Sequence, residues 1–549
     1  MVNRGRSGGC VTCRERRVKC DETRPKCQAC QRLQLQCGGY QTKYASLKFK
    51  DQNHKFGTKG VIVRGATQPN RACNLRPLSE PDTAVPFYLH HYARMGRTMS
   101  SARGFYEVLI PIYCSQRQES ALSLAVSAVA SQVLSLWRHD HSSQPQEAYT
   151  RAVKCLRRTI QDRREWGNPA TILAVLSLQL FETIDAIYSL RPSTHVHHNG
   201  AVSFLPFTNA GDDHDSASAY VRQFILHTEI CSAIRQGRQL QATVSSCIDN
   251  GLLTLPDNPS AALDGIGVSV IRLQAHLKQE LQSGHIMLST EALSECIAKT
   301  RHVEQKLLTW ANCVPEYWRP RRLSDGGNMD PSIPAYQSTC EIYPSCQIAT
   351  IWNLWCIQRI LIVKMKISLL HAQCESECND MLSTLEVAEL LHIFREMVDG
   401  VCYTVPFYLG NLSKPLSIAD FADPTILLPS AHFPDRNGEY QPQAALDEHQ
   451  RHIIAQGPWH IMSPLSRLLT FAFEADGPPM RTFFRPGQYE WIRDQFLRVT
   501  TLLHIPPVVA SAQYGVGSPS KFLERKPSDA MVENLATGVR KGAIFMSGP

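Results

Sequence analysis

Six cysteines are concentrated in residues 10–37, which read CVTCRERRVKCDETRPKCQACQRLQLQC. Their spacing is Cys-x2-Cys-x6-Cys-x6-Cys-x2-Cys-x6-Cys, at positions Cys10, Cys13, Cys20, Cys27, Cys30 and Cys37. The first three cysteines and the second three share one spacing, and Pro25 lies in the connection between them. Few large apolar residues accompany them, and domains below about 40 residues usually need metals or disulfides to fold.

This spacing points to metal binding. A Cys-x2-Cys pair presents two sulfur atoms to one ion from a single turn of chain, and structural zinc takes four tetrahedral ligands. Six thiolates cannot fill two separate four-ligand sites, but they fill two sites when two of them bridge both ions. Soft thiolates favour zinc or an iron–sulfur cluster over magnesium or calcium, and ferredoxin spacings differ from this one. We therefore expect two Zn²⁺ ions, whose binding supplies most of the folding free energy of the segment.

A disulfide knot is the alternative for six cysteines in a short segment. Disulfides form in oxidising compartments, which secreted proteins usually reach through a signal peptide. Residues 1–9 contain no apolar run, and the remaining cysteines among the 19 in the chain are scattered, many of them between apolar neighbours. Reduced thiols in an intracellular protein are therefore the favoured interpretation.

The segment resembles the fungal binuclear zinc cluster, the Zn2Cys6 class of DNA-binding transcription factors. The resemblance rests on the cysteine spacing, on the basic run after the second cysteine, on Asp21 after the third, and on Pro25-Lys26-Cys27. It implies a ligand arrangement in which the first and fourth cysteines bridge the two zinc ions. One site would then be Cys10, Cys13, Cys20 and Cys27, and the other Cys10, Cys27, Cys30 and Cys37.

Four basic residues lie between the second and third cysteines: Arg14, Arg16, Arg17 and Lys19. In the family a short helix after the second cysteine enters the major groove over a CGG triplet. The resemblance therefore implies that Arg17 reads a base with Arg16 beside it, and that Arg14 and Lys19 lie nearer the phosphates. Arginine can pair bidentately with guanine O6 and N7. Most family members carry lysine where this chain has Arg17, and the two side chains are not equivalent.

Charge is distributed unevenly along the 549 residues, whose formal net charge is +8. Residues 1–80 hold 17 Lys and Arg against 5 Asp and Glu, whereas the remainder holds 40 against 44. A basic end on a nearly neutral body predicts a nucleic-acid-binding module joined to a larger domain.

From about residue 81 the hydrophobic pattern has the helical period, and strand alternation is scarce. Helices are predicted over residues 121–137, 146–164, 169–187, 219–237, 263–281, 290–310, 348–372, 383–403 and 489–503. Connectors rich in Pro, Gly and Asp are expected between them, notably at 319–334 and 423–439. The predicted fold class is all-α: a small N-terminal binuclear zinc cluster, joined by a basic linker to a large multi-helix regulatory domain.

Five parts are predicted along the chain. They are a flexible basic arm (1–9), the Zn2Cys6 DNA-binding domain (10–40), a basic linker (41–80), an all-α regulatory domain (81–510) and a weakly ordered tail (511–549). The body is similar to the fungal-specific transcription factor domain that accompanies such clusters. That similarity rests on Phe181-Glu182, His197 to Ala201, Trp310, Trp318, Val398 to Gly410 (VDGVCYTVPFYLG) and Trp491-Ile492. It implies a regulatory role, which is ligand-responsive in some family members.

Two groups in the body are candidate metal ligands. His195, His197 and His198 could converge on one ion, but the motif follows a predicted buried helix and a structural role is favoured. His371, Cys374 and Cys378 could share one helical face, without an evident fourth ligand. Neither group is predicted to bind metal.

No Gly-x-Ser-x-Gly elbow, P-loop or dinucleotide-binding fingerprint occurs, so no enzymatic activity is expected. No membrane association is expected either, because charged residues interrupt the most apolar stretch, 351–370.

We expect a zinc-dependent, sequence-specific DNA-binding transcription factor in the nucleus. It would regulate RNA polymerase II genes as a pathway-specific or metabolic gene-cluster regulator. Double-stranded DNA and the transcription machinery or co-regulators are the expected partners; a homodimer and a small-molecule inducer stay open. Leucine-zipper heptads are absent from 41–80, so that segment gives no support for a dimer. The rival is an enzyme or metabolite-binding protein with a zinc module for oligomerisation or RNA contact. The basic run between cysteines argues against it.

Overall fold

A computed structural model covers the 549-residue chain. It describes residues 9–40, 83–93, 105–140, 142–208, 216–251, 258–282, 290–324, 329–377, 384–429, 446–474, 480–506 and 528–542. The chain divides into two compact units, residues 1–76 and 77–549. Residues 1–8 of the expected basic arm and the whole linker, 41–80, lie outside the described residues.

The small unit contains two helices of five residues, α1 (Val11–Glu15) and α2 (Gln28–Arg32). Each begins after a cysteine whose sulfur caps it. Cys10 Sγ accepts the N–H of Cys13 at 3.4 Å, and Cys27 Sγ accepts the N–H of Cys30 at 3.3 Å. The buried cluster of this unit consists of Cys10, Cys13, Cys27 and Cys30. Sulfur thus replaces the apolar core that a segment of this length lacks.

The first part of the large unit is built around α7, of whose 20 residues 16 are buried. Asn168 caps it by accepting the N–H of Ala170, and Pro169 occupies its first position, where a missing N–H has no cost. Around it lie α3 (Ala84–Tyr88), η2 (Leu89–Ala93), α4 (Tyr106–Cys114), α5 (Ala121–Arg138), α6 (Gln144–Thr159), η4 (Arg163–Glu165), α7 itself (Pro169–Tyr188), α8 (Val196–Phe204) and η5 (Leu205–Phe207).

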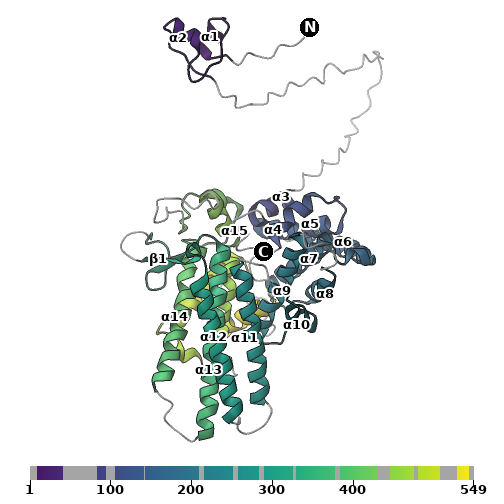
Figure 1. The fold of residues 1–549 in the computed structure, drawn as a ribbon, viewed down its shortest axis with the longest axis vertical. Helices are drawn as coiled ribbons and strands as arrows, with labels where there is room; N and C mark the ends of the chain where they lie inside the picture. Colours follow the sequence, from purple (N-terminus) through teal and green to yellow (C-terminus); the bar gives the residue numbers. More distant parts are fainter. Residues whose placement is uncertain are drawn as a thin grey trace, which may run out of the picture. The chain divides into compact units, whose positions relative to one another are not determined.

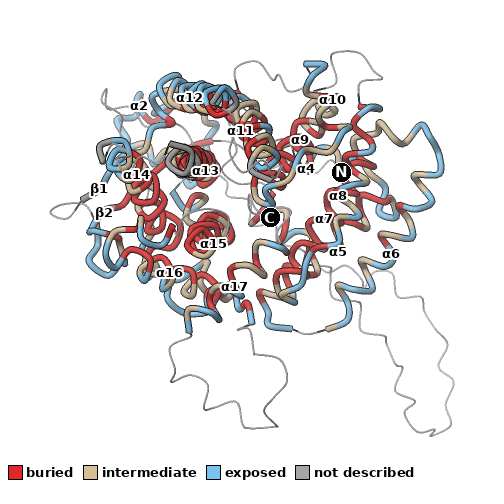
Figure 2. The backbone as a smooth tube through the Cα atoms, turned by 90° about the horizontal axis from the view of Figure 1, so that it is seen from below, coloured by how far each residue is buried: buried red, intermediate tan, exposed pale blue. Residues whose placement is uncertain are grey.

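The rest of the large unit contains longer helices, of which α11 to α14 run side by side (Figure 1). Figure 2 shows α15 with a buried backbone on most sides, and 20 of its 26 residues are buried. The elements are α9 (Ser216–Gln236), α10 (Ala242–Asp249), α11 (Pro259–Gln282), α12 (Thr290–Cys313), η6 (Glu316–Trp318), α13 (Cys346–Glu377), α14 (Thr384–Leu409), η7 (Ile418–Ala422), α15 (Leu446–Phe471), η8 (Met480–Phe483), α16 (Gln488–Leu502) and α17 (Asp529–Gly542).

The all-α prediction is confirmed, with one small exception in the described residues. Strands β1 (Arg321–Ser324) and β2 (Thr339–Ile342) pair antiparallel, with Arg321 opposite Ile342. β1 falls inside the predicted connector 319–334. The prediction of a connector is wrong for residues 321–324. The two strands pack apolar side chains against the core and pair polar side chains with each other. Leu323 and Ile342 are buried, and Arg322 Nε donates to Glu341 at 2.8 Å.

Each of the nine predicted helices corresponds to an observed one. No helix is predicted over residues 446–471, yet α15 occupies them. Pro458 and Pro464 normally disfavour a helix interior, and here burial on most sides overrides that local preference. The shorter α3, α4, α8 and α10 are also missing from the sequence predictions.

The prediction of a weakly ordered tail over 511–549 does not hold for residues 529–542. These form α17, which packs on α7 and α15. Its buried side chains recur at helical spacing: Val532, Leu535, Ala536 and Val539. An amphipathic stripe of this kind docks a terminal helix on a core.

Three helices are long and apolar enough to cross a membrane, although the sequence interpretation found none. They cover Ala121–Arg138, Pro169–Tyr188 and Cys346–Leu370. Between 67% and 89% of the residues in these windows are buried inside the large unit, so other helices already cover their apolar side chains.

Candidate metal centre and nucleic-acid interface

The six cysteines of the small unit lie together with their sulfur atoms at metal-binding distances. Cys10 Sγ lies 3.6 Å from Cys27 Sγ and 3.8 Å from Cys30 Sγ, and Cys13 Sγ lies 3.7 Å from Cys27 Sγ. Two sulfurs bound at about 2.3 Å to one tetrahedral zinc stand roughly 3.8 Å apart. A disulfide would hold them near 2.05 Å, so the knot alternative does not apply.

The sulfur atoms form two groups of four, each with the mutual separations that one ion needs. One group is Cys10, Cys13, Cys20 and Cys27; the other is Cys10, Cys27, Cys30 and Cys37. Cys10 and Cys27 belong to both groups. Six thiolates arranged in this way form a binuclear zinc site, which the donor set fits for two Zn²⁺ ions.

Backbone N–H groups prepare the two less buried cysteines for metal. Hydrogen bonds from the N–H groups of Cys10 and Glu22 lower the pKa of Cys20 to about 7. Those from Cys27 and Gly39 likewise lower the pKa of Cys37 to about 7. Burial instead raises the pKa of Cys13 to about 12. Zinc binds thiolate, so metal binding displaces protons from the buried sulfurs. Deprotonation costs less free energy at Cys20 and Cys37, whose pKa values are lower.

The two halves of the cluster repeat with an offset of 17 residues. α1 and α2 start one residue after Cys10 and Cys27, and the backbone turns back at matching positions. Val18 N–H bonds to the carbonyl of Cys13 at 3.0 Å, as Leu35 N–H does to that of Cys30. Arg17 and Gln34, which stand at equivalent positions, both adopt left-handed φ values of 57° and 50°.

Asp21 connects the two halves, a role that the sequence did not reveal. Its Oδ2 accepts the N–H of Gln28 at 3.0 Å and its Oδ1 accepts that of Ala29 at 3.1 Å, so it satisfies the first turn of α2. The Thr23 hydroxyl also donates to Asp21, and these bonds hold the pKa of the carboxyl group well below its usual range. Spacing alone could not have shown this contact, because the carboxylate precedes the helix by seven residues.

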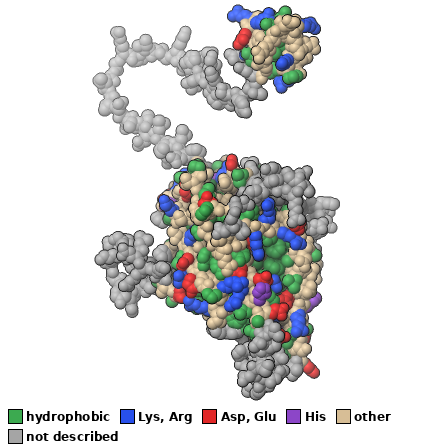
Figure 3. All heavy atoms as spheres, turned by 90° about the vertical axis from the view of Figure 1, so that its left-hand side faces the viewer, with side chains coloured by type: hydrophobic (Ala, Val, Ile, Leu, Met, Phe, Trp, Pro, Cys, Tyr) green, Lys and Arg blue, Asp and Glu red, His purple; other side chains and the backbone are tan. Residues whose placement is uncertain are grey.

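The predicted DNA-contacting residues all lie on the surface of the first half: Arg14, Arg16, Arg17 and Lys19. None of them forms an ion pair with another described residue. The described part of this unit carries seven Lys and Arg against three Asp and Glu, and the blue side chains are visible at its rim in Figure 3. Free cations on a small rigid scaffold are suited to contacting nucleic-acid phosphates and base edges.

The comparisons with known proteins agree with this geometry. Residues 8–45 match the family described as the fungal Zn(2)-Cys(6) binuclear cluster domain. No family model matches the helical body, and no solved structure matches the chain.

Curated relatives match over the same N-terminal stretch. The aspercryptin biosynthesis cluster-specific transcription regulator of Emericella nidulans is 62% identical over 37 residues, 7% of this chain and 6% of its own length. The pestheic acid cluster transcriptional regulator 3 of Pestalotiopsis fici is 57% identical over 44 residues, 8% of each chain. Arginine metabolism regulation protein II of Saccharomyces cerevisiae is 57% identical over 35 residues, 6% of this chain and 4% of its own. The match thus spans less than a tenth of these relatives.

Two of the candidate histidines of the body, His197 and His198, have separate partners in the structure. His197 Nε2 lies 3.1 Å from the Tyr149 hydroxyl, whereas His198 Nε2 lies 2.7 Å from Glu229 Oε2. Burial alone would raise the pKa of Glu229, but hydrogen bonds from Arg238 and His198 lower it to about 2. The second candidate group, His371, Cys374 and Cys378, lies outside the side chains that the structure describes.

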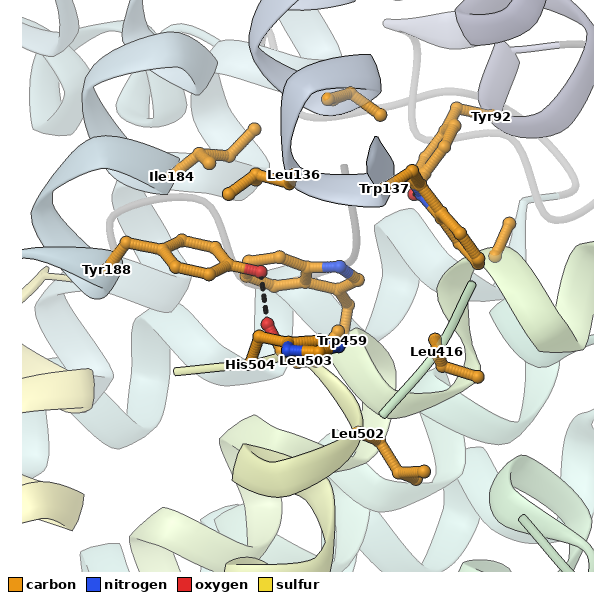
Figure 4. A pocket seen from close by; sticks show the side chains of 12 residues that line it. Tyr92, Leu136, Trp137, Ile184, Tyr188, Leu416, Trp459, Leu502, Leu503 and His504 are labelled. Carbon is orange, nitrogen blue, oxygen red and sulfur yellow. Dashed lines mark hydrogen bonds between the residues drawn. The ribbon is translucent and has the colours of Figure 1, made fainter. Parts of the chain in front are cut away.

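An apolar cavity lies between α5, α7, α15 and α16 (Figure 4). Its volume of about 30 Å³ has room for a water molecule but not for a small-molecule inducer, for which pockets of ~300–1,000 Å³ are typical. The hydroxyl of Tyr188 points toward the residues that follow α16 and donates to the carbonyl of Leu503. This cavity is part of the packing of the body.

Proposed function

We propose that the protein is a zinc-dependent transcription factor that reads CGG-type half-sites in double-stranded DNA through α1. One observation carries the proposal: the two halves of the cluster share one backbone, and only the first bears, between its second and third cysteines, four exposed cations that form no ion pair with another described residue. Arg17 would contact guanine, with Arg16 beside it, while Arg14 and Lys19 would contact phosphates. An enzyme has no use for such a run between metal ligands.

The same proposal assigns a role to each zinc ligand. Cys10 and Cys27 bridge both ions, Cys13 and Cys20 complete one site, and Cys30 and Cys37 complete the other. The two four-sulfur groups, which share Cys10 and Cys27, support this assignment. Three-residue separations within Cys10–Cys13 and Cys27–Cys30 put both members of each pair beside one helix start.

The helical body is proposed as a fungal-type regulatory domain acting in the nucleus on RNA polymerase II genes. One relative is named as a regulator specific to a biosynthesis cluster and another as a cluster transcriptional regulator, which favours a similar pathway-specific role here. The body would contact co-regulators or the transcription machinery. A second copy of the chain and a small-molecule inducer are further partners for test, and no membrane is required.

Selection from a random DNA pool tests the proposal. Full-length protein is incubated with the pool at a fixed salt concentration, and bound DNA is sequenced over several rounds. We expect enrichment of CGG triplets, whose number and orientation report monomer or dimer binding. A parallel selection with a zinc chelator should give no enrichment. Binding that does not enrich any motif, or that is abolished equally by competitor RNA and DNA, would contradict the proposal.

A further inference from the structure

Three side chains with metal-binding atoms meet in the interior of the large unit, where α13 begins beside α15. They are Cys346, the first residue of α13, and His452 and His460 of α15. The thiol sulfur and one nitrogen of each ring lie within 4.8 Å of one another. The three residues are 1%, 6% and 4% exposed, so the group is closed to bulk water.

We propose that this group binds one further transition-metal ion, Zn²⁺ or Cu⁺, apart from the two ions of the cluster. One thiolate and two imidazoles are donors that both metals accept. Zinc would complete four-coordination with a water molecule or another small ligand, whereas Cu⁺ is satisfied by fewer donors. The site joins two core helices, so occupancy stabilises the large unit by mass action.

The start of α13 favours a charged sulfur at this position. Ser345 Oγ accepts the N–H of Ile348 at 3.2 Å and thereby caps the helix. Cys346 stands in the first turn of a 32-residue helix, whose N-terminal end carries partial positive charge. A metal-bound thiolate is therefore placed where the backbone stabilises negative charge.

Polar neighbours hold the ring of His460 in a fixed orientation. Thr350 Oγ1 lies 2.9 Å from His460 Nδ1 and 3.0 Å from the Tyr408 hydroxyl. The Tyr408 hydroxyl in turn donates to the carbonyl of Cys346 at 3.2 Å. Metal-binding histidines usually have such a partner on the second ring nitrogen. This chain of contacts assigns Nε2 of His460 as the ligating atom.

The local shape of α15 brings its two histidines together. Residues eight apart rise about 12 Å along a straight helix, yet the rings of His452 and His460 lie nearly parallel with centroids 6.1 Å apart. Gly457 and Pro458 lie between them, and Pro458 removes a helix hydrogen bond. A Cβ atom at Gly457 would come within 2.2 Å of the Tyr408 carbonyl oxygen, so glycine permits the close packing of α14 on α15.

Counting metal in the full-length protein tests the proposal. The chain is loaded with Zn²⁺, or with Zn²⁺ followed by Cu⁺ under anaerobic reducing conditions, freed of unbound metal and analysed for elements. We expect a third ion per chain beyond the two in the cluster. Cys346→Ala should lose that one ion only. Cys402→Ala, which removes another buried thiol, on α14, should keep all three and controls for core damage.

His460→Gln provides a second test if Cys346→Ala does not fold. It should also lose one ion, and circular dichroism should show the helical content of the wild type. The melting temperature of the wild type should rise with the third ion, and that of His460→Gln should not. A wild-type content of two ions with both metals would overturn the proposal. A third ion that both variants retain would also overturn it.

Discussion

The two halves of the zinc cluster have one backbone and two different surfaces. Residues 10–26 and 27–40 each supply a capping cysteine, a five-residue helix and a left-handed turn seven residues after the first cysteine. Arg17 and Gln34 occupy that turn with φ values within a few degrees of each other. The metal ligands therefore set the same shape twice.

The two halves differ in the charge of their exposed side chains. The four basic residues between Cys13 and Cys20 correspond, at an offset of 17, to neutral ones in the second half: Gln31, Leu33, Gln34 and Gln36. Leu33 is 56% exposed where the first half has Arg16. The proposal that follows is that zinc provides the scaffold in both halves, while the side chains of the first half read DNA. The predictions below alter residues of the cluster, and those for Arg17 and Lys19 use the equivalent residues of the second half as their reference.

The largest effect is expected for Cys27→Ser, which removes a sulfur shared by both four-sulfur groups. Both cluster ions should be lost, and residues 10–37 should unfold, because metal binding supplies most of their stability. Elemental analysis should therefore show two fewer zinc ions per chain, together with loss of DNA binding. Cys114→Ser, at an exposed cysteine of the body, is the control. Retention of both ions by Cys27→Ser would contradict its bridging role.

Arg17→Gln gives the first half the residue that the second half has at the equivalent turn. The left-handed backbone already accepts glutamine at position 34, so the fold should persist. Binding to a CGG site should weaken by about 1–3 kcal/mol, with relaxed preference at one base. Fluorescence anisotropy titrations with cognate and mutated DNA sites measure both the affinity and the base preference. Gln34→Ala should bind normally. Equal weakening on all DNA sequences would make Arg17 a phosphate contact instead.

Lys19→Gln should have a smaller and sequence-independent effect. A phosphate contact contributes through counterion release, so affinity should fall on every DNA sequence and the salt slope should decrease by about 1. Binding measured across a series of salt concentrations gives that slope. Gln36→Ala, at the equivalent position of the second half, should leave it unchanged. A changed base preference in Lys19→Gln would contradict the assignment.

Asp21→Asn tests a side chain that connects the halves through the first turn of α2. The neutral amide keeps one acceptor oxygen but loses the charge that faces the first turn of α2. We expect wild-type zinc content and faster transfer of zinc to a competing chelator. Glu22→Gln, at an exposed neighbour whose side chain forms no hydrogen bond with α2, is the control for loss of charge. Identical transfer rates for Asp21→Asn and the wild type would show that this connection has no energetic role.

The cluster could be predicted from sequence because its determinants are local. The cysteine spacing alone indicated two ions, and the run around Arg17 stood between the ligands. The bounds of helices α5 and α7 were also predicted to within a few residues. Their sequences are so apolar that they can only lie in the buried core.

Elements that depend on distant partners could not be predicted. Pro458 and Pro464 disfavour a helix locally, and only the surrounding core stabilises α15. Glu229, the partner of His198, lies 31 residues away in sequence, with nothing in the pattern to connect them. Cys346 approaches His452 and His460 only because α13 packs on α15, more than 100 residues later in the sequence, so local spacing does not connect them.

The central claim, that zinc shapes both halves while side chains of the first read DNA, is tested by one variant. Arg14→Gln, Arg16→Leu, Arg17→Gln and Lys19→Gln together replace the four basic residues between Cys13 and Cys20 with their counterparts from the second half. The zinc content and the selectivity for the selected DNA site over random DNA are measured on the same full-length sample. We predict wild-type zinc content and no selectivity. Undiminished selectivity with both cluster ions in place would contradict the account.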